Sequence, residues 1–366
     1  MNKLLNKLLF VSAFVGCLTG CTFNFFNKDT KKETETLNPD QHTTGTYTNV
    51  VFSRAADPSV IRAADGKFYA YVTADSHSWI PGKAPFQPNG PILVSDDMVN
   101  WEYCGQAFEE KPNWIEGGSI WAPDIVYRNN KYYYYYALAI WGGLSGIGVG
   151  VSDYPYGPFE DLGMILDDNT SGNDEAIDPC VVEDDDGRVY MFYGSFGGVD
   201  RIELASDGVS LLHPDNIELD IVRGVGFGFE GTYVRKMHGS WYMMGSEGSC
   251  CSGSSSTYHV VVYKSDTLTG VYKASTGKKS NVRSSIPADQ VIMPSAECAG
   301  PGHHSILQDD DGVYWIVYHG YDIEHPNGRQ LCIDQLWFNE ETKMPYVKDF
   351  KSTMGTATKA PYVEKK

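Results

Sequence analysis

Three carboxylates and a histidine recur at one position of a repeated pattern in this chain. Asp57, Asp178, Glu230 and His303 each lie eight residues before a short polar turn, and Trp121 occupies the same position in a fifth copy. Hydrolysis of a glycosidic bond needs a carboxylic acid that protonates the leaving oxygen and a carboxylate on the other side of the sugar. Crowded carboxylates also raise one another's pKa, which keeps the acid protonated near neutral pH. Three acids that meet in space therefore supply both groups.

The segments around these residues are hydrophobic and aromatic runs on both sides of a turn, which is the pattern of an antiparallel hairpin. The five turns are Asp65-Gly66, Asn129-Asn130, Asp186-Gly187, His238-Gly239 and Asp311-Gly312. Consecutive copies are 52 to 73 residues apart. A strand-only repeat of that size predicts an all-β fold, a five-bladed β-propeller, in which equivalent positions of the blades converge on a central axis.

Single members of this set are weak evidence. An Asp before Pro, as at Asp57, is an ordinary strand start, and a lone histidine such as His303 is most often structural. The repetition of Asp-Pro at Asp178 in the same register makes coincidence less plausible. The acidic runs at 183–186 and 309–311 occupy hairpin tips, where we interpret them as solvated turns without the ligand spacing of an EF-hand.

The N-terminus carries a targeting pattern. Lys3 and Lys7 precede an apolar run from Leu8 to Leu18, and Leu-Thr-Gly-Cys ends at Cys21. This order resembles a bacterial lipoprotein signal and is too short for a comfortable membrane span. We predict a signal peptide over 1–20, lipidation of Cys21, a flexible polar tether over 21–45 and the propeller over 46–366. A plain secretory signal with an incidental cysteine is the alternative.

The net charge limits the kinds of partner that we expect, and the cysteine content limits the disulfides. The formal net charge is −18, and it becomes −20 when a leader with two lysines and no acid is removed. No basic stripe is visible, so we expect a neutral substrate and no nucleic acid. We expect most of the six cysteines beyond residue 21 to be buried thiols, while the adjacent pair Cys250-Cys251 indicates a specific local structure.

Aromatic side chains are the usual platforms for the apolar faces of sugar rings. Five of them lie in predicted loops or at strand starts and are candidate sugar contacts: Trp79, Trp114, Trp121, Trp141 and Phe196.

Five motifs in one order carry a resemblance to a known family. They are ADPSV at 56–60, WAPDI at 121–125, AIDPC at 176–180, FEGTY at 229–233 and GPGHHS at 300–305. The chain resembles glycoside hydrolase family 43, five-bladed propellers that act on arabinose and xylose polymers. The strings GSCCSGSSSTYHVVV at 248–262 and GSF at 194–196 are more similar to arabinan endo-1,5-α-L-arabinosidases than to xylosidases.

The resemblance implies a role for each matched residue. Asp57 would be the general base, Glu230 the general acid and Asp178 the modulator of the acid's pKa. The family inverts configuration, so the base and acid should be roughly 6.5 to 9.5 Å apart. His303 would hold a calcium ion in the central channel together with waters. Asp124, three residues past the axial position, would be structural or would contact substrate.

The same resemblance implies a set of sugar contacts. We expect these residues to line the subsites: Trp121, Gly142, Glu175, Ala176, Ile177, Ser195, Phe196 and Gly197. Many family members have His before the base and Asn three residues before the modulator, where this chain has Ala56 and Glu175. These departures leave the three carboxylates intact and concern the subsites and the exact linkage.

The sequence thus predicts an exported, lipid-anchored monomer at a bacterial cell surface or in the periplasm, which cleaves internal α-1,5-L-arabinofuranosyl linkages of arabinan with inversion. Two alternatives remain open. One is an exo-acting α-L-arabinofuranosidase or β-xylosidase of the same family. The other is a surface glycan-binding lipoprotein without turnover, although a binder has no reason to keep Asp57, Asp178 and Glu230 in register.

Overall fold

The structure is a computed structural model that describes residues 36–42, 45–74, 84, 86–172, 175–196, 198–215, 217–222 and 228–364. The predicted signal peptide, the lipidation residue Cys21 and the predicted contact Gly197 lie outside these residues. Thr36 to Lys366 form one compact unit. No helix in the described part of the chain has the length and apolar content needed to cross a membrane.

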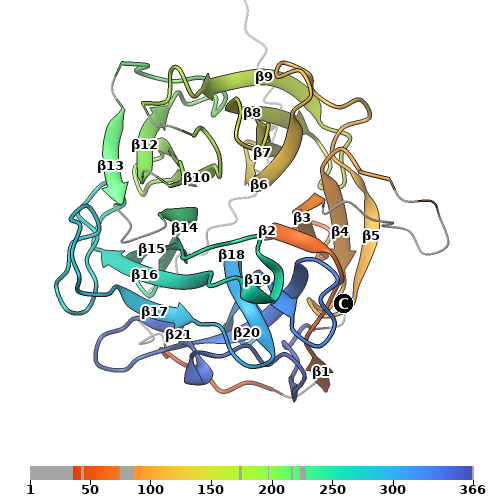
Figure 1. The fold of residues 1–366 in the computed structure, drawn as a ribbon, viewed down its shortest axis with the longest axis vertical. Helices are drawn as coiled ribbons and strands as arrows, with labels where there is room; N and C mark the ends of the chain where they lie inside the picture. Colours follow the sequence, from red (N-terminus) through yellow and green to blue (C-terminus); the bar gives the residue numbers. More distant parts are fainter. Residues whose placement is uncertain are drawn as a thin grey trace, which may run out of the picture. The chain divides into compact units, whose positions relative to one another are not determined.

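Five four-stranded antiparallel sheets surround a central axis (Figure 1). Blade 1 consists of β2 (Ala55–Arg62), β3 (Phe68–Ala74), β4 (Pro91–Ser95) and β5 (Trp101–Gln106). Blade 2 consists of β6 (Ser119–Arg128), β7 (Lys131–Ala139), β8 (Ser145–Ser152) and β9 (Glu160–Asp167). Blade 3 consists of β10 (Cys180–Glu183), β11 (Val189–Tyr193), β12 (Val199–Leu204) and β13 (Glu218–Val222).

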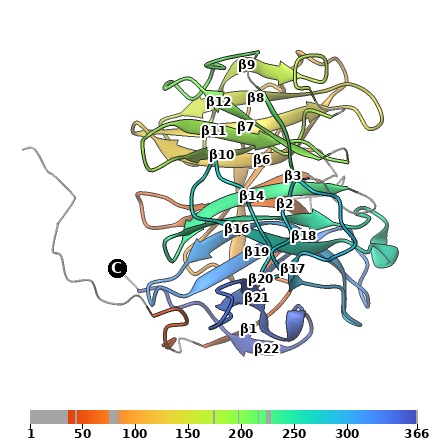
Figure 2. The same ribbon diagram turned by 90° about the vertical axis from the view of Figure 1, so that its left-hand side faces the viewer.

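Blade 4 consists of β14 (Phe229–Met237), β15 (Ser240–Glu247), β16 (His259–Ser265) and β17 (Asp289–Ile292). Blade 5 consists of β18 (Cys298–Gln308), β19 (Tyr314–Asp322), β20 (Gln330–Phe338) and β21 (Pro345–Val347). Each sheet runs in chain order, with its first strand nearest the axis (Figure 1). The buried clusters each join residues of two neighbouring blades, so adjacent sheets pack face to face, and Figure 2 shows the same sheets from the side. The predicted five-bladed propeller is confirmed.

The tyrosine run of β7 shows how the blades hold together. Side chains alternate between the two faces of a strand, so Tyr134 and Tyr136 enter the layer between blades 1 and 2. Tyr133 and Tyr135 enter the layer between blades 2 and 3. Because both faces of blade 2 are buried, the strand reads as a continuous aromatic run rather than an alternating one.

The backbone bends at one position in every blade. Five residues at the axis have positive φ, and all lie six residues before the residue that closes the inner hairpin: Asp57, Ala122, Asp178, Gly231 and His303. The predicted axial set is therefore wrong by one residue in two blades, where Ala122 and Gly231 replace Trp121 and Glu230. The cause is the turn. Blades 2 and 4 have two-residue turns, whereas the other three blades have three-residue turns.

The bend frees a backbone N–H that joins neighbouring blades. Ala122 N–H donates to Thr73 Oγ1 at 2.7 Å, and His303 N–H donates to Ser246 Oγ at 2.9 Å. Gly231 N–H donates to Asp178 Oδ2 at 2.9 Å, and in blade 1 the Asp57 N–H donates to a histidine of blade 5 at 3.2 Å. In each case the acceptor belongs to the preceding blade, so the bends connect the blades around the axis.

The N-terminal segment closes the ring against blade 5. Strand β1 (Thr46–Thr48) pairs with β22 (Ala357–Lys359). The side chain of Asn49 receives the N–H of Ile333 at 3.0 Å and donates to its carbonyl at 2.8 Å. Residues 36–42, which the sequence assigns to the tether, belong to the compact unit, and Asn38 makes the same pair of bonds to the backbone of Phe338.

Candidate active site

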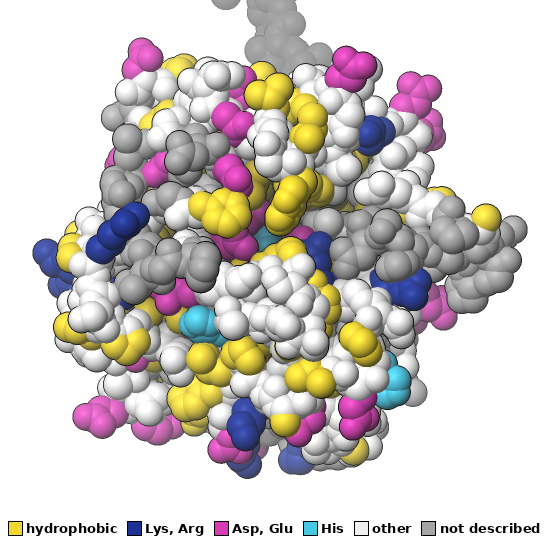
Figure 3. Space-filling view, in the orientation of Figure 1, with side chains coloured by type: hydrophobic (Ala, Val, Ile, Leu, Met, Phe, Trp, Pro, Cys, Tyr) yellow, Lys and Arg dark blue, Asp and Glu magenta, His cyan; other side chains and the backbone are white. Residues whose placement is uncertain are grey.

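A hollow of about 860 Å³ opens at the axis and is lined by residues from all five blades. Figure 3 shows acidic side chains and a histidine at its floor and hydrophobic side chains around its rim. The floor includes Asp57, Asp178, Glu230 and His303. The propeller therefore brings together the four ionisable residues that the sequence selected.

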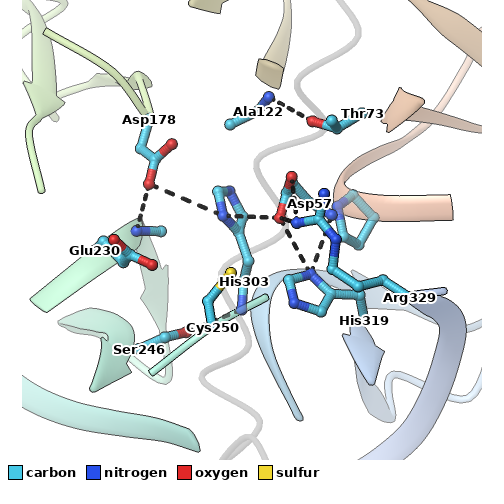
Figure 4. Close-up of polar contacts among 12 residues, drawn as sticks. Asp57, Thr73, Ala122, Asp178, Glu230, Ser246, Cys250, His303, His319 and Arg329 are labelled. Carbon is cyan, nitrogen blue, oxygen red and sulfur yellow. Dashed lines mark hydrogen bonds and ion pairs between the residues drawn. The ribbon is translucent and has the colours of Figure 1, made fainter. Parts of the chain in front are cut away.

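Asp57 is held by cationic and imidazole groups of blade 5. Arg329 Nη1 lies 2.9 Å from Asp57 Oδ1 and 3.0 Å from Oδ2, and His319 Nδ1 lies 3.1 Å from Oδ1 (Figure 4). Burial alone would raise the pKa of this carboxyl, but Arg329, His303 and His319 together lower the pKa well below its usual range. Asp57 is therefore ionised at neutral pH.

Asp178 and Glu230 form a second acidic group on blades 3 and 4. Burial raises the pKa of Asp178 well above its usual range, and the charges of Glu230 and Asp57 raise it further. Burial also raises the pKa of Glu230, although hydroxyl groups of Ser195 and Tyr258 donate to that carboxylate and oppose the shift. The pair keeps a proton that exposed carboxyls would lose.

His303 lies between the two acidic groups (Figure 4). Its Nδ1 is 3.3 Å from Asp57 Oδ1 and 4.0 Å from Asp178 Oδ2. Burial lowers the pKa of the imidazole to about 4, so the ring is neutral at pH 7. An Nδ1–H that faces Asp57 leaves Nε2 with a free lone pair, which suits a water or a metal ion.

The donor set tests the predicted ion at His303. Among the described residues, no group of three or more His, Cys, Asp or Glu side chains is arranged to hold a metal. The described residues therefore form no cage of protein ligands, and the ion at His303 stays a prediction that the resemblance carries.

The predicted sugar contacts divide into two groups. Five line the hollow: Trp121, Gly142, Glu175, Ile177 and Phe196. Ala176 and Ser195 are fully buried behind the lining, where Ala176 N–H donates to Ser145 Oγ and Ser195 bonds to Glu230. These two residues support the site rather than face a sugar.

Trp141 and Phe196 are the most exposed aromatic side chains of the hollow, at 77% and 56%. Their rings are free to stack on a ligand. Trp141 also packs edge-on against Trp121 at 6.2 Å between ring centroids.

Four residues of the site were missed by the sequence analysis: Ser246, Tyr258, His319 and Arg329. Ser246 and His319 pair with the residues that precede Gly231 and His303, so both follow from the repeat once its register is known. Arg329 lies in the β19–β20 loop, outside the repeated pattern. Its only sequence signal is the need of three buried acids for a counter-charge.

Asp124 proves to be a connector between blades. It accepts hydrogen bonds from Ser59 Oγ of blade 1 at 3.1 Å and from the N–H of Val181 of blade 3 at 2.7 Å. Burial raises its pKa to about 6. Its side chain is buried and does not line the hollow, which favours the structural interpretation.

The family model described as glycosyl hydrolases family 43 matches residues 47–343, which is most of the chain. The chain belongs to this family. An ionised carboxylate at one blade and a proton-holding pair at another, with a hollow between them, are what hydrolysis of a glycosidic bond by a family 43 enzyme requires.

Two relatives of this chain have names that state different modes of action. The chain is 30% identical over 279 residues to the extracellular exo-α-(1→5)-L-arabinofuranosidase of Cellvibrio japonicus, covering 69% of this chain and 79% of that protein. It is 30% identical over 257 residues to the extracellular endo-α-(1→5)-L-arabinanase 1 of Bacillus subtilis, covering 67% and 76%.

Among solved structures, the α-L-arabinanase of Cellvibrio cellulosa in complex with arabinohexaose is similar at a TM-score of 0.71 and 27% identity. The match covers 81% of this chain and 96% of that protein.

Proposed function

We propose that this family 43 protein is an inverting hydrolase that cleaves internal α-1,5-L-arabinofuranosyl linkages of arabinan. The observation that carries the proposal is the geometry of the hollow, where Asp57 is paired with Arg329 while Asp178 and Glu230 lie buried on other blades. These environments shift the pKa of Asp57 down and the pKa values of Asp178 and Glu230 up, which separates base from acid. The arabinan substrate is supported by relatives named for α-1,5-arabinan chemistry.

The proposed reaction is a single displacement. Asp57 accepts a proton from a water as the water oxygen bonds to the anomeric carbon. Glu230 donates its proton to the departing glycosidic oxygen as that bond breaks. The products are a sugar with inverted configuration and a new chain end, and the two protons are later exchanged with solvent.

Asp178 acts on this reaction through Glu230. Two buried carboxyls that interact titrate as a pair, so Asp178 influences how firmly the pair holds a proton. Asp178 is held in place by the Gly231 N–H, so its carboxyl remains next to the acid. His303 would hold an ion with waters in the channel, and that ion would supply fixed positive charge beside the carboxylates. Loss of activity on chelation, restored by calcium but not magnesium, tests this part.

Chromatography of products over time from linear α-1,5-arabinan tests the mode of action, with Asp57→Ala as the blank. We expect a transient ladder of oligosaccharides that shortens with time, because internal cleavage releases long fragments first. Early arabinose without a ladder would instead identify an exo enzyme, which the Cellvibrio japonicus relative favours. Binding of arabinan without any product would identify a glycan-binding protein.

We also propose that a lipid on Cys21 anchors the protein to a membrane. Two relatives carry the word extracellular in their names, which agrees with export. Mass spectrometry of the mature N-terminus, with Cys21→Ala as the unlipidated control, tests the anchor and its predicted site.

A further inference from the structure

A disulfide between adjacent cysteines stands at the edge of the hollow. Cys250 and Cys251 are bonded to each other, and both line the hollow. They lie in the loop that joins β15 to β16 and contains the short helix η1 (Gly253–Ser255). Cys251 is exposed and Cys250 half-buried, so the disulfide is accessible in the hollow that both residues line.

The loop around the disulfide is held firmly by hydrogen bonds. Its ends are joined by Ser249 N–H to Thr257 Oγ1 and by Thr257 N–H to the Ser249 carbonyl, each at 3.0 Å. The Ser252 N–H donates to the buried Ser256 Oγ at 2.9 Å. The position of the disulfide is therefore fixed by the fold of the loop.

This loop adjoins Glu230. Glu230 pairs with Ser246 across the β14–β15 ladder, and the chain reaches Cys250 four residues later. At the other end of the loop, the hydroxyl of Tyr258 bonds to Glu230. In Figure 4, Cys250 lies on the side of the site that carries Glu230, and Arg329 and His319 lie beside Asp57 on the opposite side. The disulfide is thus a neighbour of the proposed acid.

The two sides of the hollow differ in surface chemistry. Blades 2 and 3 present exposed aromatic rings, of which Trp141 and Phe196 are the most exposed. On blade 4 the loop residues around the disulfide that line the hollow are small: Gly248, Ser249 and Ser252. A disulfide is apolar, polarisable and without hydrogen-bond donors, so it offers an apolar surface on a loop whose aromatic ring, Tyr258, is buried.

We propose that the Cys250–Cys251 disulfide forms the apolar surface that contacts the departing sugar. The inference builds on the proposed function, in which Glu230 protonates the leaving oxygen, because the sugar that leaves must lie against the acid. A contact made to that sugar and kept in the transition state raises kcat/KM on substrates with a sugar leaving group. It does nothing for a substrate that lacks one.

The test compares two substrates in the variant Cys250→Ala/Cys251→Ala. α-1,5-Arabinotetraose has a sugar as leaving group, whereas α-arabinobiosyl fluoride releases fluoride. We expect kcat/KM to fall about tenfold on arabinotetraose, the size of effect that one apolar contact has on specificity. On the fluoride we expect kcat/KM to stay within about twofold, because no sugar leaves and the disulfide has nothing to contact in the transition state.

Reduction of the wild-type protein provides a second arm. Cys104, Cys180, Cys298 and Cys332 are free thiols, so a phosphine reductant opens one disulfide in the part of the chain that the structure describes. We expect the wild type to lose activity on arabinotetraose and to recover it on reoxidation. The double variant is the matched control and should not respond to the reductant.

Three outcomes would overturn the inference. Unchanged kcat/KM on arabinotetraose would show that the disulfide does not contact the leaving sugar. Equal losses on both substrates, or a loss on arabinotetraose that comes with a displaced alkaline limb of the kcat/KM profile, would show that the loop only positions residues of the site such as Glu230, because fluoride leaves with little help from an acid. A wild-type protein that hydrolyses neither substrate would overturn the proposed function and this inference with it, whereas turnover of both substrates by the wild type separates the two.

Discussion

Two clusters of buried polar side chains in this propeller have opposite characters. At the ring closure, the carboxylate of Asp334 accepts hydrogen bonds from Thr353 Oγ1 at 2.6 Å and from Tyr318 Oη at 2.7 Å. In the same region, the side-chain amide of Asn49 forms hydrogen bonds with the backbone carbonyl and N–H of Ile333. At the axis, Asp57, Asp178 and Glu230 crowd around a hollow instead.

The two clusters differ in the groups that offset the effect of burial on the pKa of each carboxyl. Burial raises the pKa of Asp334 to about 6, and neutral hydroxyl and amide donors oppose that shift. At the axis one carboxyl is paired with Arg329, while burial raises the pKa of the two others and the charge of Glu230 adds to the shift at Asp178. Buried carboxylates with neutral partners and no cavity stabilise the fold. Carboxyls whose pKa values are shifted in opposite directions beside a cavity indicate a catalytic site. Mutations should affect the two clusters differently.

The largest effect on activity should come from Glu230→Gln. The amide keeps the size of the side chain and can still accept bonds from Ser195 and Tyr258, but it has no proton to give. We expect kcat on arabinan to fall by about 10³-fold, within the usual range for a general acid. Binding of arabino-oligosaccharides, measured by calorimetry, should persist. Normal turnover in this variant would remove Glu230 from the acid role.

Arg329→Gln should have an intermediate effect with a pH signature. Asp57 works ionised, and Arg329 is the main group that offsets its burial. Without the arginine the folded-state pKa of Asp57 rises, so the carboxyl stays protonated to a higher pH. We expect the acid limb of the kcat/KM profile to move to higher pH by about one unit or more. The alkaline limb, which reports the Asp178–Glu230 pair, should move less. Equal displacement of both limbs would contradict the assignment.

Asn49→Ala should leave the chemistry unchanged and weaken the fold. The substitution removes the partner of the buried N–H of Ile333, while the Ile333 carbonyl keeps the bond from Tyr47 Oη. We expect the free energy of unfolding to fall by about 1–3 kcal/mol, because one buried backbone donor loses its bond. Urea unfolding measures the loss, and kcat on arabinan at 25 °C should equal that of the wild type. A large loss of kcat without loss of stability would mean that the closure and the axis are coupled.

The sequence was sufficient for the blades and for the identity of the acidic residues at the axis. Turn residues and flanking apolar runs are local signals, so the five hairpins could be found without a structure. The register was wrong at Trp121 and Glu230 because two-residue and three-residue turns look alike when only a polar dipeptide is counted. Glu230 nevertheless reaches the hollow from the position before the bend.

The rest of the site depends on contacts that have no local signal. Arg329 reaches Asp57 from a loop 272 residues later in the chain. Tyr258 approaches Glu230 from the β15–β16 loop, which lies close to Gly300 and Gly302 of blade 5. The packing of the blades determines which of these residues meet, and that packing leaves no local pattern in a single sequence.

The pairing of β1 with β22 has a consequence for how the gene could be cut and rejoined. Thr46 lies opposite Lys359, so the two ends of the compact unit run alongside each other. Every blade is built from one uninterrupted stretch of chain, and no blade borrows a strand from the far end. A circular permutant that starts at β6 and joins the old ends by a short linker would keep all five sheets whole. The order of the blades around the axis is thus independent of where the polypeptide begins.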